Sequence, residues 1–425
     1  MSSISQANIK FTMTRRQKLL MPIVMIGAFF EGYDFMVINM SLPYIAHDFV
    51  LDDQVTGMML SIIAIGTLMA FFMVRLGDKY GRKPVFLVSV AAFSLLSLAT
   101  AFTPNMQLFV ICQFLARIFL VATWAVGIII MAEEFPVELR GRAIGLFQGA
   151  AAIGAIFPSL LLPVAAMTPL GWRTLFIIGA LPLVIVLIMG KNFHETERFK
   201  KAKESSEAKP SFFAVFKHPY RKHMIAVSAL WFFIYMGYTT AMTFFSYRVV
   251  NELGWTESQV GLTMALAFTI GLSGYVVAGK LLDAMGRKKT AMLFFLCGVS
   301  AVVLTFQLTT YIPIMLAQIV GVFFVGSFTV ICASFTNELF PTAIRANATA
   351  WGNNIFGRIG QIMAPALVGF LAVHMGGVGN AVSLVALGPL AGIFIVAVFM
   401  PETRNREMKD HMDVQGEVQQ DALQV

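Results

Sequence analysis

The chain has 425 residues, of which 58% are hydrophobic and only 13% are charged, and its 31 Lys and Arg against 23 Asp and Glu give a net charge of +8. A soluble domain carries about 25% charged residues, because its surface faces water. The composition therefore excludes a chain of soluble domains. The charged residues gather between apolar runs that are long enough to cross the roughly 30 Å of a bilayer core. We predict an all-α, polytopic membrane protein.

Apolar runs between charged or Pro/Gly-rich breaks predict twelve membrane spans. The spans are expected near 19–41, 55–75, 85–102, 106–131, 144–166, 172–190, 223–248, 258–280, 290–308, 312–335, 346–373 and 379–400. The longest polar break separates two groups of six. We therefore expect an N-terminal half (1–190), a cytoplasmic linker (191–222), a C-terminal half (223–400) and a cytoplasmic tail (401–425).

The basic residues are distributed unevenly over the predicted loops. All but four of the 31 lie in the N-terminus, the even-numbered loops and the C-terminal tail, and the exceptions are Arg117, Arg173, Arg248 and Arg358. By the positive-inside rule, both termini and the linker are predicted to be cytoplasmic. The net charge is therefore a topology signal, with anionic lipid head groups rather than nucleic acid as the expected partner.

The remaining motifs of common sites are missing from the sequence. The cysteines at positions 112, 297 and 332 lie in apolar segments and lack the spacing of a disulfide framework or a metal site. No Walker motif is present, so ATP is not implied. No metal, nucleotide or other cofactor is expected.

The second half of the chain repeats the first at a constant spacing. The segment RLGDKYGRK (75–83) recurs as KLLDAMGRK (280–288), and EFPVELR (134–140) recurs as LFPTAIR (339–345), each 205 residues later. The dipeptide Glu195-Thr196 recurs as Glu402-Thr403, 207 residues later. Two homologous six-helix halves follow, which is the parallel-repeat architecture of one class of transporters.

The loop GDKYGRK and its copy LDAMGRK resemble the signature between the second and third helices of each half in the major facilitator superfamily, and the resemblance covers the whole chain. It implies a transporter, not an enzyme, that works by alternating access. In that family, such charges latch the two halves together on the cytoplasmic side. Topology charges that hold loops in water are the alternative interpretation. The predicted gate residues are Asp78, Gly81, Arg82, Glu134, Arg140, Asp283, Gly286, Arg287, Glu338 and Arg345.

Four charged residues lie well inside the spans, namely Glu31, Asp34, Arg117 and Arg358. Each costs at least about 2.5–3.5 kcal/mol at the centre of a bilayer, so such residues are functional candidates by default. Their charges cancel, and none is repeated in the other half. This asymmetry favours a task performed once, at the interface between the halves. A structural ion pair of Arg117 with Glu31 or Asp34 is the alternative.

Two segments around these charges also resemble known transporters. GAFFEGYDF (27–35) resembles the first helix of bacterial aromatic-acid and metabolite proton symporters. GRIGQIMAP (357–365) resembles a helix of those symporters and of organic-anion transporters. The resemblance implies a protein of the bacterial inner membrane.

The charges suggest the chemistry of a transport site. A guanidinium matches a carboxylate with two parallel hydrogen bonds, so Arg358, with Arg117, is expected to bind an organic anion. Glu31 or Asp34 is expected to carry a proton, and the sequence does not decide between them. Neighbouring side chains at helical spacing complete the predicted binding set, although packing is an equal interpretation for the aromatic ones: Tyr33, Gln113, Trp124, Tyr235, Tyr238, Asn354 and Gln361.

These observations predict a monomeric, proton-coupled symporter that imports a small organic anion, such as an aromatic or other carboxylic acid. The alternative is a proton-coupled antiporter that exports drugs or metabolites. A membrane receptor or enzyme is disfavoured, because the sequence has no nucleophile elbow, phosphate loop or appended soluble domain.

Overall fold

The computed structural model describes residues 14–189, 195 and 211–404, so most of the predicted linker and of the predicted tail lies outside the described residues. The described elements are all helical, as the composition predicts. The first half contains α1 (Arg15–Asp48), α2 (Asp53–Tyr80), α3 (Arg82–Ala101), α4 (Met106–Glu134), α5 (Val137–Ala166), α6 (Arg173–Gly179) and α7 (Pro182–Met189).

The second half has the same order of long helices. It contains the short helix η2 (Ala214–Phe216), then α9 (Arg221–Asn251), α10 (Glu257–Met285), α11 (Arg287–Gln307), α12 (Tyr311–Gly326), α13 (Phe328–Leu339), α14 (Thr342–Thr349), the π-helix η3 (Ala350–Gly357), α15 (Arg358–Met375), α16 (Val378–Val385) and α17 (Gly388–Phe399).

Eleven helical segments of the described residues are long and apolar enough to cross a membrane, by length and composition. The predicted span near 172–190 differs, because it consists of two short helices, α6 and α7, that meet at Ala180 and Leu181. Pro182 begins α7 and cannot donate a backbone hydrogen bond to the preceding turn, so the helix breaks there. Pro389 repeats this break between α16 and α17, 207 residues later.

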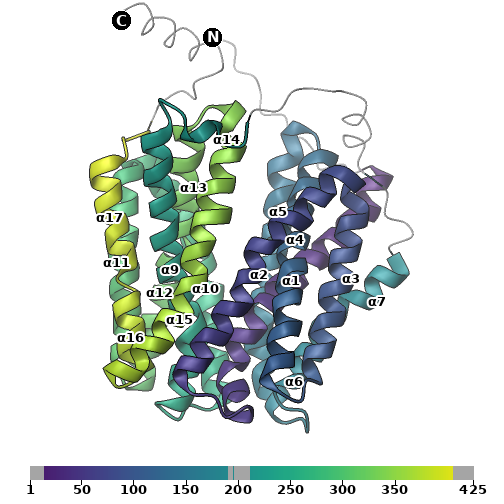
Figure 1. Cartoon of the computed structure of the whole chain (residues 1–425), viewed down its shortest axis with the longest axis vertical. Coiled ribbons are helices and arrows are strands. Elements are labelled where there is room, and N and C mark those ends of the chain that lie inside the picture. Colours follow the sequence, from purple (N-terminus) through teal and green to yellow (C-terminus); the bar gives the residue numbers. More distant parts are fainter. Residues whose placement is uncertain (1–13, 190–194, 196–210, 405–425) are drawn as a thin grey trace, which may run out of the picture.

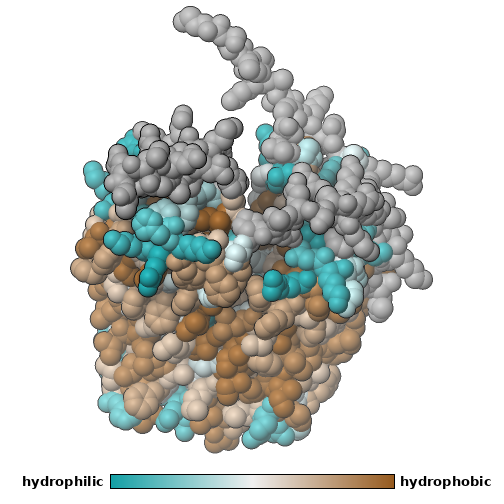
Figure 2. Space-filling model, turned by 45° about the horizontal axis from the view of Figure 1, so that its top comes forward, coloured by the Kyte–Doolittle hydropathy of each residue, from teal (hydrophilic) through white to brown (hydrophobic). Residues whose placement is uncertain are grey.

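The two halves lie side by side, with α1–α7 in purple to blue-green and α9–α17 in teal to yellow (Figure 1). Across the interface, α2 packs against α15, α5 against α10, and α1 against α9. We call the end of the bundle where α1 begins and α17 finishes the terminal end, and the other end the distal end. Hydrophobic side chains cover the middle of the molecule, and hydrophilic ones gather towards both ends (Figure 2).

Contacts between the helices of the two halves gather at the distal end. There the hydroxyl of Tyr247 donates to Asp53 Oδ1 at 2.7 Å, and the hydroxyl of Ser61 accepts the backbone N–H of Ala366 at 2.8 Å. The backbones approach so closely that a Cβ on Gly57 would lie 2.3 Å from the carbonyl oxygen of Pro365. The halves are therefore tightly packed at the distal end.

Candidate transport site

The four membrane-embedded charges come together between the halves, from α1, α4 and the start of α15. Arg117 interacts electrostatically with Asp34, Glu31 and Arg358, and Glu31 interacts with all three of the others. None of the ion pairs found in the described residues joins two of these four groups. The charges thus share one site without neutralising one another in a direct contact, and the structural ion pair considered above does not form in this conformation.

A small cavity of about 40 Å³ lies at this site and is lined by both halves. Pockets for small molecules usually have volumes of roughly 300–1,000 Å³, so this cavity has room for a few water molecules only. Its polar lining residues are Asn39, Thr67, Arg117, Tyr238, Thr239, Thr243 and Gln361. Its apolar lining residues are Phe35, Ile38, Leu60, Ile63, Ala64, Met242 and Pro365.

Arg117 lines this cavity from the first half. The residue is only 8% exposed, and its guanidinium carbon lies 5.2 Å from the centre of the Phe35 ring. Among the described residues, its five N–H donors take part in none of the hydrogen bonds found. A buried polar group is normally hydrogen-bonded, so a buried guanidinium beside a cavity favours an anionic ligand.

The two carboxylates of α1 have different surroundings. Asp34 is 3% exposed, and its Oδ1 accepts a hydrogen bond from the hydroxyl of Ser97 in α3 at 3.0 Å. Glu31 is half-buried and makes no hydrogen bond within the described chain. A larger hollow of about 400 Å³ lies between α1 and α5, and the α1 residues that line it are Met25, Ile26 and Phe29, on the face of the helix opposite Glu31.

Arg358 is held by its own half. Its Nη1 donates to Oε1 of Gln361 at 2.6 Å, and its guanidinium carbon lies 5.1 Å from the centre of the Tyr235 ring. The hydroxyl of Tyr235 donates to Oδ1 of Asn353 at 2.8 Å. Gln361 therefore connects Arg358 to the cavity that Arg117 lines.

Several of the predicted binding residues do not line the cavity. Tyr33 is 1% exposed and donates to the carbonyl oxygen of Leu175, so it is a packing residue in this conformation. Gln113 donates to the hydroxyl of Thr100 in α3, within the core of the first half. Trp124 donates to Gln148 of α5 at 3.3 Å.

Asn354 also does not line the small cavity. The prediction puts it on one α-helical ridge with Arg358 and Gln361. The π-helical turns of η3 alter this register, so Asn354 is exposed and Asn353 faces Tyr235 instead.

Other residues of the site escaped the sequence analysis. Asn39 follows Glu31 and Phe35 at intervals of four, so the helical spacing of polar and aromatic residues could have found it. Thr239 stands 205 residues after Asp34 and lines the cavity as its repeat counterpart. Thr67 and Ser97 carried no signal, because hydroxyl side chains are common in membrane helices.

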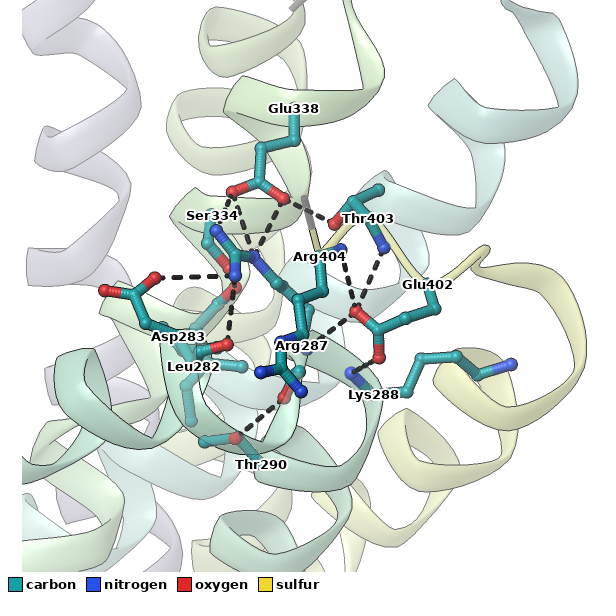
Figure 3. Close-up of polar contacts among 12 residues, drawn as sticks. Leu282, Asp283, Arg287, Lys288, Thr290, Ser334, Glu338, Glu402, Thr403 and Arg404 are labelled. Atoms are coloured by element: carbon teal, nitrogen blue, oxygen red, sulfur yellow. Dashed lines mark hydrogen bonds and ion pairs between the residues drawn. The ribbon is translucent and has the colours of Figure 1, made fainter. Parts of the chain in front are cut away.

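A second group of charges lies at the terminal end and surrounds the repeated loop motif. Arg287 donates to both carboxylate oxygens of Glu338 at 2.8–3.1 Å and forms an ion pair with Asp283 at 3.4 Å (Figure 3). It also donates to the carbonyl oxygen of Leu282, and the hydroxyl of Thr403 donates to Glu338. The guanidinium thus connects the end of α10 to the end of α13.

Glu402 binds the other side of this loop (Figure 3). Its carboxylate accepts the backbone N–H groups of Arg287 and Lys288 at 2.8 and 3.1 Å, at the start of α11. It also accepts those of Thr403 and Arg404. Burial by itself would raise the pKa of Glu402, but these four N–H donors outweigh burial and hold its pKa below the ordinary value of 4.5.

The first half repeats this arrangement. Arg82 pairs with Asp78 at 3.2 Å and with Glu133 at 3.0 Å, and Glu195 accepts the backbone N–H groups of Arg82 and Lys83 at the start of α3. The glycines of the two loops have the positive φ that a tight turn requires, 107° at residue 81 and 91° at residue 286. The repeated Glu-Thr dipeptide thus supplies a carboxylate cap for one helix in each half.

The loop network of the first half includes a residue that was not predicted. Arg82 bonds the side chain of Glu133, which lies 205 residues before Glu338. The carbonyl oxygen of the predicted gate residue Glu134 accepts the side chain of Gln17. The repeat spacing, applied to Glu338, identifies Glu133.

The two remaining predicted gate arginines lie near the starts of α5 and α14. Arg345 donates to the carbonyl oxygen of Phe340. Two nitrogen atoms of Arg140 are buried without a hydrogen-bond partner among the described residues. The contacts described above for the two loop networks each stay within one half, and the latch between the halves stays a prediction.

Known proteins match this chain along most of its length. The sequence model of the Major Facilitator Superfamily matches residues 24–251 and 232–415. The probable 4-methylmuconolactone transporter of Cupriavidus pinatubonensis is 27% identical and covers 77% of each chain. The cis,cis-muconate transport protein of Acinetobacter baylyi is 27% identical over 80% of this chain and 84% of its own.

A solved structure agrees in fold. The xylose transporter XylE of E. coli in its inward open conformation superposes with a TM-score of 0.72 at 17% identity, over 93% of this chain and 98% of its own. The twofold family match, the two six-helix halves and the repeated loop motif lead to the same conclusion. The chain is a multi-pass membrane transporter, not an enzyme, and it belongs to the Major Facilitator Superfamily.

Proposed function

We propose that this transporter is a proton-coupled symporter that imports a small organic anion, such as an aromatic or other carboxylic acid. The observation that carries the proposal is Arg117, a buried arginine that lines a cavity between the halves and whose guanidinium makes none of the hydrogen bonds found among the described residues. A guanidinium in this position binds a carboxylate through two charge-assisted hydrogen bonds. The relative named for cis,cis-muconate supports a carboxylate substrate.

The balance of charge at the site supports coupling to a proton. Two carboxylates and two guanidiniums cancel while the site is empty. A bound anion adds one uncompensated negative charge, which is costly away from water. One proton on Glu31 or Asp34 restores neutrality. One monovalent anion and one proton therefore cross together.

The proposed orientation follows the basic residues. Both termini and the linker face the cytoplasm of a bacterial cell, and the protein works as a monomer in the inner membrane. The contacts at the distal end then close the periplasmic side. This is an inward-facing arrangement, and substrate enters from the periplasm after the halves rock about the site.

Uptake of radiolabelled benzoate and cis,cis-muconate into proteoliposomes tests the proposal. We expect uptake to rise with an inward proton gradient and to be insensitive to membrane potential for the monovalent anion. Arg117→Ala and Arg358→Ala should each raise KM at least tenfold, because each removes charge-assisted hydrogen bonds. Arg173→Ala is the matched control, because Arg173 pairs with Asp48 at the distal end.

Three outcomes contradict the proposal. Uptake that ignores the proton gradient rejects the coupling. Retention of wild-type KM in both arginine variants rejects the binding site. Efflux of lipophilic cations in exchange for protons, without carboxylate uptake, favours the exporter instead.

A further inference from the structure

Arg358 stands at the end of an unusual helix. The residues before it, Ala350–Gly357, form the π-helix η3, in which hydrogen bonds run from residue i to residue i+5. In an α-helix, Asn353 would point well away from the face that Arg358 occupies, whereas the wider turns of a π-helix rotate it toward that face. The contacts agree, because Asn353 bonds Tyr235 and Asn354 is exposed.

Packing fixes the π-helix against α9. A Cβ on Gly357 would lie 2.6 Å from the ring of Tyr235, and a Cβ on Gly352 would lie 3.0 Å from the ring of Trp231. At its start, Trp351 donates to the carbonyl oxygen of Phe212 at 3.0 Å and stacks on that ring with the centres 4.9 Å apart. Both ends of η3 are therefore anchored.

Tyr235 is held on all sides by these contacts. Its ring stacks on Trp231 at 5.6 Å, and Trp231 is itself fixed by a hydrogen bond to the hydroxyl of Thr336. The Tyr235 hydroxyl donates a hydrogen bond to Asn353, and the guanidinium of Arg358 lies over the Tyr235 ring. A ring locked in this way offers a fixed platform for a cation.

We infer that Asn353 and Tyr235 are positioning residues that hold Arg358 in the orientation that receives the substrate carboxylate. The π-helix is the device that places Asn353 in this role. The hydroxyl of Tyr235 is engaged with Asn353, so it is not a substrate ligand. The inference rests on the proposed function, in which Arg358 binds the anion, and it adds how the second half prepares that group.

The consequence is a defined kinetic effect. If the Tyr235 ring is no longer fixed, the guanidinium of Arg358 samples more orientations. Binding of a carboxylate then costs more conformational entropy, because the guanidinium must be ordered at the same time. Binding weakens, whereas the rocking of the halves is unaffected. The role of Asn353 is therefore visible in KM rather than in the maximal rate.

The test compares Asn353→Ala, Tyr235→Phe and the double variant in proteoliposomes with radiolabelled benzoate and cis,cis-muconate. Each single variant should raise KM about tenfold with a maximal rate within twofold of wild type. The double variant should be no worse than either single variant, because both remove the same hydrogen bond. Asn347→Ala is the control, since Asn347 bonds the carbonyl oxygen of Ser211 instead.

A second measurement needs no substrate. Phenylglyoxal modifies guanidinium groups, and mass spectrometry of the purified protein gives the rate at Arg358. We expect Asn353→Ala and Tyr235→Phe to change this rate at least threefold, and Asn347→Ala to leave it at the wild-type value. Wild-type KM and wild-type modification rates in Asn353→Ala overturn the inference, as does an equal effect of Asn354→Ala.

The two proposals fail in different ways. If Arg358→Ala transports both anions with wild-type KM, the binding role of Arg358 is wrong, and the proposed function fails. If Arg358→Ala abolishes uptake while Asn353→Ala matches wild type in KM and in modification rate, only the positioning role is wrong. The modification rate decides the positioning role even when neither anion is a substrate.

Discussion

Glu31 and Asp34 lie on the same helix, three residues apart, yet their surroundings suit different tasks. Asp34 is fixed by Ser97 and removed from solvent, whereas Glu31 has no hydrogen bond in the described chain and is only half-buried. A proton carrier must exchange its proton with water in at least one conformation. Glu31 meets this requirement better than Asp34.

We expect Glu31→Gln to abolish accumulation driven by a proton gradient while exchange of labelled for unlabelled substrate continues. The amide is neutral throughout the cycle, so it mimics the permanently protonated state, in which the loaded carrier still crosses. Counterflow in proteoliposomes measures the exchange. Ser97→Ala is the comparison, because it perturbs Asp34 and leaves Glu31 intact. Accumulation by Glu31→Gln at the wild-type level would assign the proton to Asp34.

Close packing of α1 and α5 also depends on single residues. A Cβ at Gly154 would lie 1.8 Å from the carbonyl oxygen of Phe29, and one at Gly32 would lie 1.9 Å from that of Ala151. Backbone atoms cannot rotate away as a side chain does. The two helices therefore approach closely because both positions are glycine, as in other membrane helix pairs.

Gly154→Ala should destabilise the protein by about 1–3 kcal/mol, the usual cost of overpacking, because α1 and α5 must separate to admit the methyl group. Thermal unfolding in detergent measures the change. Gly141→Ala lies on the same helix with nothing within 4 Å of its Cβ, so it should unfold at the wild-type temperature. Equal unfolding temperatures for the two variants would contradict the close contact.

At the scale of the helix, each repeated loop ends with a carboxylate that receives the first N–H groups of the next helix. The start of a helix has unpaired N–H groups and a positive partial charge, so an anion there stabilises it. Glu402 does this for α11, and Glu195 does it for α3. Each cap comes from a segment that follows the last helix of its own half, and so closes that half.

Glu402→Gln should lower the stability of the protein by about 1 kcal/mol at neutral pH, because the amide lacks the charge that α11 receives. The pKa of Glu402 in the folded protein lies below its ordinary value of 4.5. Its contribution is therefore complete above about pH 4.5 and is lost as the pH falls through the lower folded-state value. The difference in unfolding temperature between wild type and variant should stay constant from pH 7 to pH 5 and narrow below that range.

The control for this cap is Asp52→Asn at the start of α2. The Asp52 side chain accepts the backbone N–H of Val55, and an asparagine side chain caps a helix about as well. Asp52→Asn should therefore change the unfolding temperature only slightly at every pH. If the difference in unfolding temperature between wild type and Glu402→Gln increased as the pH falls, the pKa of Glu402 would be raised in the folded protein rather than lowered.

For the molecule as a whole, the balance between inward- and outward-facing states depends on the contacts that join the halves at each end. At the distal end, Tyr247 of α9 donates to Asp53 at the start of α2. The interface contains a second tyrosine and carboxylate from opposite halves, because Tyr44 of α1 interacts electrostatically with Glu257 at the start of α10. The Tyr44 hydroxyl makes no hydrogen bond of normal geometry among the described residues. Only the first pair therefore acts as a formed clasp in this conformation.

Tyr247→Phe should shift the population toward the state that is open at the distal end. The lost hydrogen bond is partly exposed, so we expect about 1 kcal/mol, or roughly a fivefold change in the ratio of the two states. Labelling of a cysteine introduced at Thr67, in the cavity, by an impermeant maleimide applied from the distal side reports this shift. Tyr311→Phe is the control, because Tyr311 packs on Trp255 within its own half. A labelling rate equal to that of the control would exclude a clasp.

The loop networks at the terminal end add to this balance. The contacts found for Arg82 and Arg287 reach carboxylates of their own halves, so each loop is already assembled before the halves meet. A rigid loop of this kind can dock on the other half as one body when the terminal end closes. The latch itself stays a prediction, for the conformation in which the terminal end is closed.

The class of protein, the two repeated halves, the loop motif and the four membrane-embedded charges can all be identified in the linear sequence. Hydropathy, charge placement and repeat spacing are properties of the linear chain, so they need no coordinates. The prediction that Arg117, Arg358, Glu31 and Asp34 share a site also came from charge alone, because such groups are too costly to scatter through a bilayer.

Only the tertiary structure decided which neighbours face that site. Tyr33 and Gln113 turn into the core of their own half, because helix rotation is set by packing against α3 and α6. Asn353 replaces Asn354, because a π-helix interrupts the α-helical register that the sequence pattern assumes. The closed distal end was equally beyond the sequence, since it depends on contacts between residues about 200–300 positions apart that no local pattern encodes.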